Sequence, residues 1–299
     1  MTSSSRPGQL TAPPDATVET IAEGGTDGLL VPPIWIWLSF VGALIAAAGN
    51  IVGLLATNRI YGLETSLFAD ASIAQDFVSL TVVVPLTIVL GRLARHGSVK
   101  AYVCWVGCVM FTAYSYAIYA FSVHFGPLFM PWVAVLGLAC YAFVGGLVTV
   151  DSSVVRNWFA ARAQPVAAWT LIVVATLFTL LWLKEIVPDN LAGRPSASAA
   201  DFNVPTNPVH VLDLALFLPA ALASGVLLLK RRPAGYTIAP GVLVFFALTC
   251  VPILLTPIVA NARGHDPAWT VAAPITMLLA ATIVVLWKTL RYGSVTRNA

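Results

Sequence analysis

Residues 165–183 read PVAAWTLIVVATLFTLLWL and contain no charged side chain. A helix rises about 1.5 Å per residue, so an apolar stretch of this length matches the roughly 30 Å of hydrocarbon in a bilayer. We therefore predict an all-α fold, a polytopic membrane helix bundle of about eight transmembrane helices. The other seven apolar stretches are residues 34–56, 73–91, 100–123, 128–150, 209–229, 237–260 and 268–288.

The composition of the whole chain agrees with this prediction. Of its 299 residues, 59% are hydrophobic and 10% are charged, whereas a soluble domain usually carries about 25% charged residues. There is no Arg/Lys-rich helix and no basic patch with interleaved aromatic residues, so we expect the lipid bilayer as partner and no nucleic acid. The four cysteines fall inside apolar stretches, which is typical of small packing residues.

The two ends of the chain differ from the rest. Residues 1–31 are rich in Ser, Thr, Pro, Gly and acids and show no apolar period. Such a composition predicts a disordered tail. Residues 32–292 form the predicted transmembrane domain, and residues 293–299 a short C-terminal tail.

The basic residues predict how the bundle is oriented. Eleven Lys and Arg fall in the loops near Arg92, Arg156 and Lys230 and after the last apolar stretch, and only four fall in the opposite set of loops. Cytoplasmic loops carry the excess of Lys and Arg. We therefore predict a multi-pass protein of the cell membrane with both termini, and hence both tails, in the cytoplasm.

The second and sixth apolar stretches share a pattern. The second opens with Gln75-Asp76 and holds Pro85, and the sixth holds Asp213 and Pro219. Each ends in a basic turn that contains a glycine. Because both run in the same direction and stand four helices apart, the pattern predicts a parallel 4+4 repeat about an axis along the membrane normal.

Ionisable groups at bilayer depth are costly, so they point to a functional site. Two acids, Asp76 and Asp213, meet this description, and each shares a helix face with other polar residues. We predict an outward-facing polar pocket that binds or transports a small molecule or a cation. The candidate ligand-binding residues are Asn50, Gln75, Asp76, Tyr116, Tyr119, His210 and Asp213.

Some of these residues also have a structural interpretation. Ser72-x-x-Gln75 has the spacing of a capping box and Asp70 could cap the same helix, which would place Asp76 near the helix dipole. Asn207-Pro208 is typical of a cap and first turn. His265-Asp266 is expected to cap the last helix. The tyrosines are typical of a helix-packing face with hydrogen-bonded hydroxyls.

No HExxH, GxSxG, Walker or CxxC motif occurs in the sequence. His124 and His210 lack partners at a known ligand spacing, so no metal or cofactor is expected. Two further functions stay open beside binding or transport. One is an intramembrane enzyme in which the two acids act on a lipid or isoprenoid. The other is a structural or assembly subunit whose polar stripes join helices.

Residues 50–147 carry motifs that resemble a family of multi-pass membrane proteins of high-GC bacteria with no established activity. Members more often have Asn at the position of Gly126. The resemblance implies a topology and no particular chemistry. The motifs are Tyr61-Gly62-Leu63-Glu64-Thr65, Ala74-Gln75-Asp76, Arg95-His96-Gly97-Ser98, Tyr114-Ser115-Tyr116-Ala117 and Phe125-Gly126-Pro127-Leu128-Phe129, followed later by residues 211–219 and 231–236.

Overall fold

The computed structural model describes residues 31–159, 162 and 164–292. This part of the chain is all-α, and eight of its helical segments are long and apolar enough to cross a membrane. The predicted fold class, a polytopic membrane helix bundle, is therefore confirmed. Residues 1–30 and 293–299, nearly all of the two predicted tails, lie outside the described residues.

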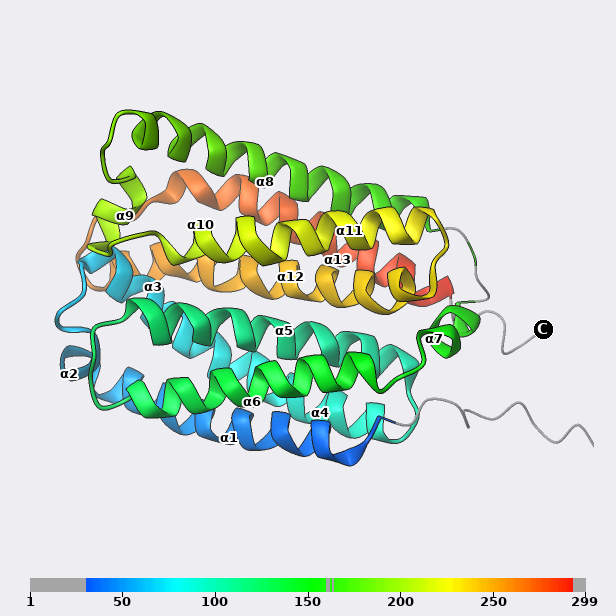
Figure 1. Cartoon of the computed structure of the whole chain (residues 1–299). Helices are drawn as coiled ribbons and strands as arrows, with labels where there is room; N and C mark the ends of the chain where they lie inside the picture. The colour runs from blue at the N-terminus through cyan, green and yellow to red at the C-terminus, as the bar shows by residue number, and fades with distance from the viewer. Residues whose placement is uncertain (1–30, 160–161, 163, 293–299) are drawn as a thin grey trace, which may run out of the picture.

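Figure 1 shows the spans running side by side, with short helices at the ends of the bundle. These short helices are α2 (Thr57–Tyr61), α7 (Ser152–Trp158) and α9 (Ala197–Phe202). The spans are α1 (Pro33–Leu55), α3–η1–α4 (Ser66–Arg95), α5 (Val99–Ser122), α6 (Phe129–Val148), α8 (Pro165–Leu191), α10–η2–α11 (Pro208–Leu229), α12 (Pro233–Ala262), and η3 (Trp269–Val271) with α13 (Ala272–Tyr292).

The second span begins earlier than predicted because Thr65 is its N-cap. The Thr65 hydroxyl accepts a hydrogen bond from the backbone N–H of Phe68 at 3.3 Å. The predicted capping box and the predicted Asp70 cap are therefore wrong, and Ser72 instead donates to the Phe68 carbonyl at 2.8 Å. Asp76 consequently lies well past the first turn, where the helix dipole no longer accounts for an acid.

The cap predicted for the sixth span is confirmed. The side-chain oxygen of Asn207 accepts a hydrogen bond from the backbone N–H of Val209 at 2.9 Å, and Pro208 occupies the first helical position. This pairing satisfies a terminal N–H that the helix itself leaves unbonded, while proline needs no partner at that position.

Two spans contain a π-helix, and in both it lies at the same distance from the end of the span. The π-helix η1 (Ser79–Val83) separates α3 (Ser66–Val78) from α4 (Val84–Arg95), and η2 (Asp213–Phe217) separates α10 (Pro208–Leu212) from α11 (Leu218–Leu229). A proline follows each at the second position, Pro85 and Pro219. Proline lacks an N–H and its ring clashes with the preceding turn, so the wider turn accommodates it.

The two halves of the chain follow one register. Adding 134 to a residue number in the first half turns η1 into η2, α4 into α11, and the first residue of α5 into the first residue of α12. The turns before α5 and α12 match too, because Gly97 and Arg231 both have positive φ, at 84° and 52°. This register supports the predicted 4+4 repeat. It also corrects one detail, since Asp213 matches Ser79 and not Asp76.

The helices α5 and α12, which are equivalent in the repeat, lie at the centre of the bundle. They are the two most buried spans. They cross at Gly107 and Gly241, which are equivalent residues under the same register, and a Cβ on Gly107 would overlap the carbonyl oxygen of Gly241. Phe111 and Phe245, also equivalent, face each other with ring centroids 6.5 Å apart. Contacts between equivalent residues are expected at a two-fold axis.

The two halves differ in how tightly their outer helices pack. In the first half, α1 and α6 have buried residues along their whole lengths, from Ile36 to Gly53 in α1 and from Trp132 to Gly146 in α6. In the second half, α8 and α13 do not. No residue in the described segments 176–191 and 269–281 is buried.

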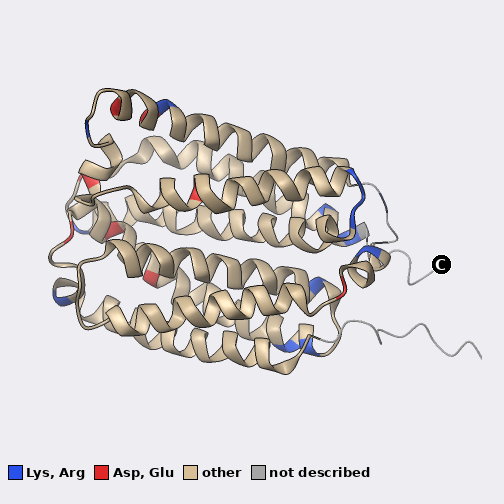
Figure 2. Ribbon diagram, viewed as in Figure 1, with Lys and Arg blue, Asp and Glu red and all other residues tan. Residues whose placement is uncertain are grey.

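The two ends of the bundle differ in charge. Figure 2 shows Lys and Arg gathered at the end where α4 meets α5, which we call the basic end. The opposite end carries α2 and α9 and is called the α9 end. The buried residues of α8, from Ala167 to Ala175, and of α13, from Thr282 to Thr289, lie toward the basic end. The second half therefore spreads apart toward the α9 end.

Candidate functional site

The spreading of these helices leaves a cavity of about 610 Å³. Its size falls in the range of small-molecule sites, roughly 300 to 1,000 Å³. Its walls come from α3, α5, α8, α9, α10–η2–α11, α12 and η3–α13, and most of them are apolar. The aromatic residues of the lining are Phe68, Phe111, Tyr114, Tyr119, Phe178, Trp182, Phe202, Phe217, Phe245 and Phe246.

Asp213 is the one charged residue among those that line the cavity in the described part of the chain. It is the first residue of η2, and the indole N–H of Trp182 donates to its Oδ2 at 2.9 Å. The hydroxyl of Tyr114 also interacts with this side chain. Within the described residues no Lys, Arg or His forms an ion pair with Asp213. The cavity therefore presents one carboxyl group without a cationic partner.

Gln75 lines the same cavity from another wall. Its side-chain amide donates to the hydroxyl of Ser79 at 2.8 Å and to that of Ser115 at 3.2 Å. Tyr119 also contributes to the lining. Of the predicted site residues, the structure thus brings Gln75, Tyr119 and Asp213 to one cavity.

Asp76 is not among the residues that line the cavity. It accepts hydrogen bonds from the hydroxyls of Tyr61 at 2.7 Å and Tyr119 at 2.9 Å, and it is 1% exposed. A Cβ on Gly53 of α1 would overlap its carboxyl group, so α1 approaches closely at this point. Asp76 therefore joins four elements, α1, α2, α3 and α5, in a closed polar cluster.

Asn50 and Tyr116 extend this cluster in the first half. The Tyr116 hydroxyl donates to the side-chain oxygen of Asn50 at 3.0 Å, and both residues are buried. The rings of Tyr116 and Tyr119 lie edge-on with centroids 5.6 Å apart. These contacts fit the structural interpretation of the tyrosines as a packing face. Neither Asn50 nor Tyr116 lines the large cavity.

His210 lies behind the cavity wall. Its ring packs against that of Trp182 with centroids 4.6 Å apart, and its Nε2 is 3.8 Å from Oε2 of Glu185. The other carboxylate oxygen of Glu185 accepts hydrogen bonds from the backbone and hydroxyl of Ser198 in α9. His210 thus supports Trp182, which in turn holds Asp213.

Three residues outside the predicted site position these acids. Tyr61 lies between two apolar stretches and belongs to a motif of the family resemblance, but nothing in the sequence assigns it a partner. Trp182 stands near the end of a span, where a tryptophan is expected to be an interfacial anchor. Tyr114 opens another of the resemblance motifs, directly before Ser115 and Tyr116. None of these residues has a sequence signal that reveals its partner, because each partner is on another helix.

His265 does not cap the last helix, so that prediction is wrong. Its Nδ1 lies 2.7 Å from Oδ2 of the buried Asp70, and Nε of Arg263 lies 3.1 Å from Oδ1 of the same residue. The residue before η3 is Ala268, which provides no side-chain cap. The α12–α13 turn of the second half is therefore tied to α3 of the first half.

Replacing Asp70 by alanine is expected to loosen the α12–α13 turn. The side chains of Arg263 and His265 would lose a buried acceptor. The expected loss of stability is limited to about 1 to 2 kcal/mol, because both side chains are about one third exposed. Hydrogen–deuterium exchange should rise at residues 261–271. Asp266→Ala alters an exposed acid of the same turn and should leave the exchange unchanged. Equal effects of the two variants would contradict this assignment.

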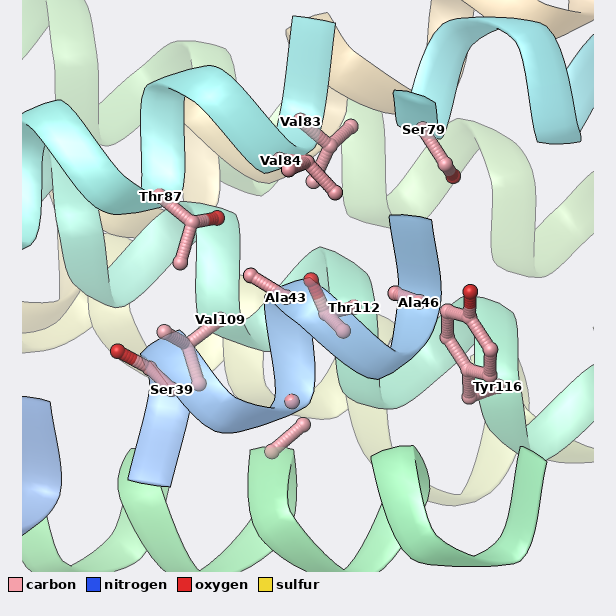
Figure 3. A pocket seen from close by; sticks show the side chains of 12 residues that line it. Ser39, Ala43, Ala46, Ser79, Val83, Val84, Thr87, Val109, Thr112 and Tyr116 are labelled. Atoms are coloured by element: carbon pink, nitrogen blue, oxygen red, sulfur yellow. The ribbon is translucent and has the colours of Figure 1, made fainter. Parts of the chain in front are cut away.

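A second, much smaller void lies in the first half, near η1. It measures about 20 Å³ and is lined by α1, η1–α4, α5 and α6. Figure 3 shows Ser39 and Ala43 on one side of it and Val84 and Thr87 on the other. This volume is enough for about one water molecule and for nothing larger. The large cavity, which the second half forms together with α3 and α5 of the first half, is therefore the candidate ligand site.

Fold and cavity together define a multi-pass integral membrane protein with a mainly apolar cavity among its helices. Within the described residues no group of three or more His, Cys, Asp or Glu side chains is arranged to hold a metal ion. Comparisons with protein-family models, with curated proteins and with solved structures find no match to the chain. The resemblance to membrane proteins of high-GC bacteria therefore stays a prediction.

Proposed function

We propose that this membrane protein binds an amphiphilic small molecule in the large cavity, either to transport it or to present it. The apolar body of the ligand would pack among the aromatic and aliphatic walls. A cationic or hydrogen-bond-donating group would bind Asp213. The observation that carries this proposal is a cavity of about 610 Å³ whose one charged lining residue has no cationic partner among the described residues.

The energetics favour such a ligand. A carboxyl group in apolar surroundings is destabilising unless its charge and lone pairs are satisfied. Trp182 supplies one donor at 2.9 Å and the Tyr114 hydroxyl also interacts with the carboxyl group, but neither carries a positive charge. A ligand amine could supply a further charge-assisted hydrogen bond, and such bonds are about twice as strong as neutral ones. The apolar walls would add binding energy in proportion to the area that the ligand buries.

This proposal revises the polar pocket expected from the sequence. The cavity is mainly apolar. Its lining does not include Asn50, Asp76 or Tyr116, which instead form hydrogen bonds between helices. The enzyme alternative requires two acids near one substrate, but Asp76 does not line the cavity and accepts hydrogen bonds from Tyr61 and Tyr119. The assembly alternative explains the tyrosine cluster and leaves the cavity unexplained.

We also propose that the basic end faces the cytoplasm. Cytoplasmic ends of membrane proteins carry the excess of Lys and Arg, and the described basic residues gather at that end (Figure 2). On this assignment both termini are cytoplasmic. The cavity, which lies toward the α9 end, would then lie in the outer part of the membrane.

Asp213→Asn tests the proposed function. We expect decylamine to raise the unfolding temperature of the protein in neutral detergent more than decanol does, and the variant to lose this difference. A hydrogen bond to a charged group contributes about 1.5 to 3 kcal/mol, so the affinity for decylamine should fall roughly 10- to 100-fold. The measurement is thermal unfolding across a ligand titration.

Asp201→Asn is the matched control, because Asp201 is an exposed acid of α9 at the same end of the bundle. It should retain the preference for the amine. Unchanged decylamine affinity in Asp213→Asn, with a folded protein, would overturn the proposed site.

A further inference from the structure

Because the two halves of the chain are related by the repeat, the helices around the cavity can be compared with their equivalents in the first half. In the first half, α1 and α6 close against each other: the ring of Trp35 packs where a Cβ on Gly145 would lie, and a Cβ on Gly42 would lie 3.5 Å from Cβ of Leu138. Their equivalents in the second half are α8 and α13. These two lack buried residues at the α9 end, between residues 176 and 191 and between 269 and 281. The same architecture is therefore closed in one half and open in the other.

The lining residues themselves show where the cavity reaches the surface. Leu181 of α8 lines the cavity and is 50% exposed, Val271 before α13 is 37% exposed, and Ile253 of α12 is 37% exposed. The lining residues contributed by α3, α5 and α10–η2 are not exposed. The opening thus lies between α8 and α13, with α12 at its base. We call it the α8–α13 gap.

The surface around this gap consists of exposed apolar side chains, as expected of a surface that contacts lipid. Leu177 and Leu180 of α8 are each 59% exposed, and Met277 of α13 is 67% exposed. All three lie in helices long and apolar enough to cross a membrane. A gap with such borders opens sideways to hydrocarbon, so the molecules that meet it are dissolved in the bilayer.

The depth of Asp213 can be derived from its position in its span. Asp213 follows the start of the span, Pro208, by five residues, which corresponds to about 8 Å of helix. A span of this length begins near the boundary between head groups and hydrocarbon, so a lipid amine has to reach a short way into the cavity to meet Asp213. The apolar floor formed by Phe111, Phe217 and Phe245 lies deeper, with Phe217 about 6 Å of helix beyond Asp213, and apolar carbons of the ligand would pack against it.

We propose that the ligand is a bilayer lipid whose head group carries an amine, and that it enters sideways through the α8–α13 gap. The amine binds Asp213, and one hydrocarbon chain occupies the cavity down to its aromatic floor. This inference rests on the proposed function, which requires only that some amphiphile binds at Asp213. It adds the class of ligand and its route.

Photo-labelling in nanodiscs tests the ligand class. Two lipids would carry the same diazirine-bearing acyl chain, one a phosphatidylethanolamine and the other a phosphatidylglycerol. We expect the amine lipid to label peptides that contain Phe217 and Phe245, and the glycerol lipid to label mainly exposed residues such as Leu44, which is 62% exposed on α1. Equal cavity labelling by both lipids would overturn the amine preference.

Cross-linking tests the route. In a variant without the four native cysteines, Leu181→Cys and Val271→Cys would be joined across the gap by a reagent of about 10 Å, which reaches farther than a disulfide. Joining them before lipid is added should reduce cavity labelling to background. Labelling of Leu44 should not change. Cavity labelling that persists would mean entry from the aqueous α9 end and would overturn the lateral route.

The first half supplies a matched control pair. Gly42→Cys and Leu138→Cys would join α1 to α6 at a Cβ separation of 3.5 Å, which suits a disulfide. This cross-link should leave cavity labelling intact. If no lipid labels the cavity while decylamine still stabilises the protein through Asp213, the lipid inference fails and the proposed function stands. If decylamine binding is also independent of Asp213, the proposed function fails as well.

Discussion

Gly107→Ala is expected to lower the free energy of unfolding by about 2 to 3 kcal/mol, the upper part of the range for overpacking a buried site. The added Cβ would overlap the carbonyl oxygen of Gly241 and lie 2.6 Å from Cβ of Val244. Backbone atoms of α12 cannot rotate aside as a side chain can. The two central helices would have to separate, and the contacts of both halves depend on their crossing.

Gly137→Ala is the control for this effect. Gly137 also lies in a membrane-spanning helix, α6, but a Cβ there would meet no atom within 4 Å. Alanine is a better helix former than glycine by about 1 kcal/mol, so this variant should be as stable as the wild type or slightly more stable. Reversible unfolding in mixed detergent micelles measures both. A neutral Gly107→Ala would contradict the close crossing of α5 and α12.

The second large effect is expected at the buried carboxyl of Asp76. Tyr61→Phe and Tyr119→Phe should each lower the free energy of unfolding by about 1 to 3 kcal/mol, because each removes a donor and leaves a buried acceptor unsatisfied. The two hydroxyls lie 2.7 and 2.9 Å from the carboxylate oxygens of Asp76. The same unfolding measurement applies.

A double-mutant cycle separates this interaction from packing. In an Asp76→Ala background, Tyr119→Phe should cost much less, because no buried carboxylate is left without its donor; the hydroxyl then keeps the Ser72 carbonyl at 3.0 Å and the Tyr61 hydroxyl as partners. Tyr141→Phe is the control, since Tyr141 is 69% exposed on α6. Undiminished effects of Tyr119→Phe without the acid would show that the hydrogen bond to Asp76 contributes little.

These predictions assign different roles to the two acids. Asp76 is enclosed by donors from α2 and α5 and holds the first half together. Asp213 interacts with the indole of Trp182 and the hydroxyl of Tyr114, and it also faces a cavity. Variants of Asp76 should therefore change stability first, whereas variants of Asp213 should change ligand binding first. We expect the two aspartates to have different roles because their neighbours differ.

The sequence alone predicts the eight spans and the Asn207 cap. Hydropathy, span length and capping are local properties, so they can be read along one segment of chain. It also pointed to the repeat, because Pro85 and Pro219 stand at matching places in spans of the same direction. The predicted start of the second span is wrong, because the helix begins several residues before the apolar stretch, after its N-cap Thr65.

Which polar residues contact one another depends on how the helices pack in three dimensions. Helical spacing fixes the face on which a side chain lies and says nothing about the helix opposite, so Asp76 and Asp213 were placed in one pocket that the fold divides into a cluster and a cavity. The partners Tyr61 and Trp182, and the tie between Asp70 and the α12–α13 turn, join segments far apart in the chain. The cavity itself exists because two nearly equivalent halves pack to different degrees, and packing is a property of the whole bundle.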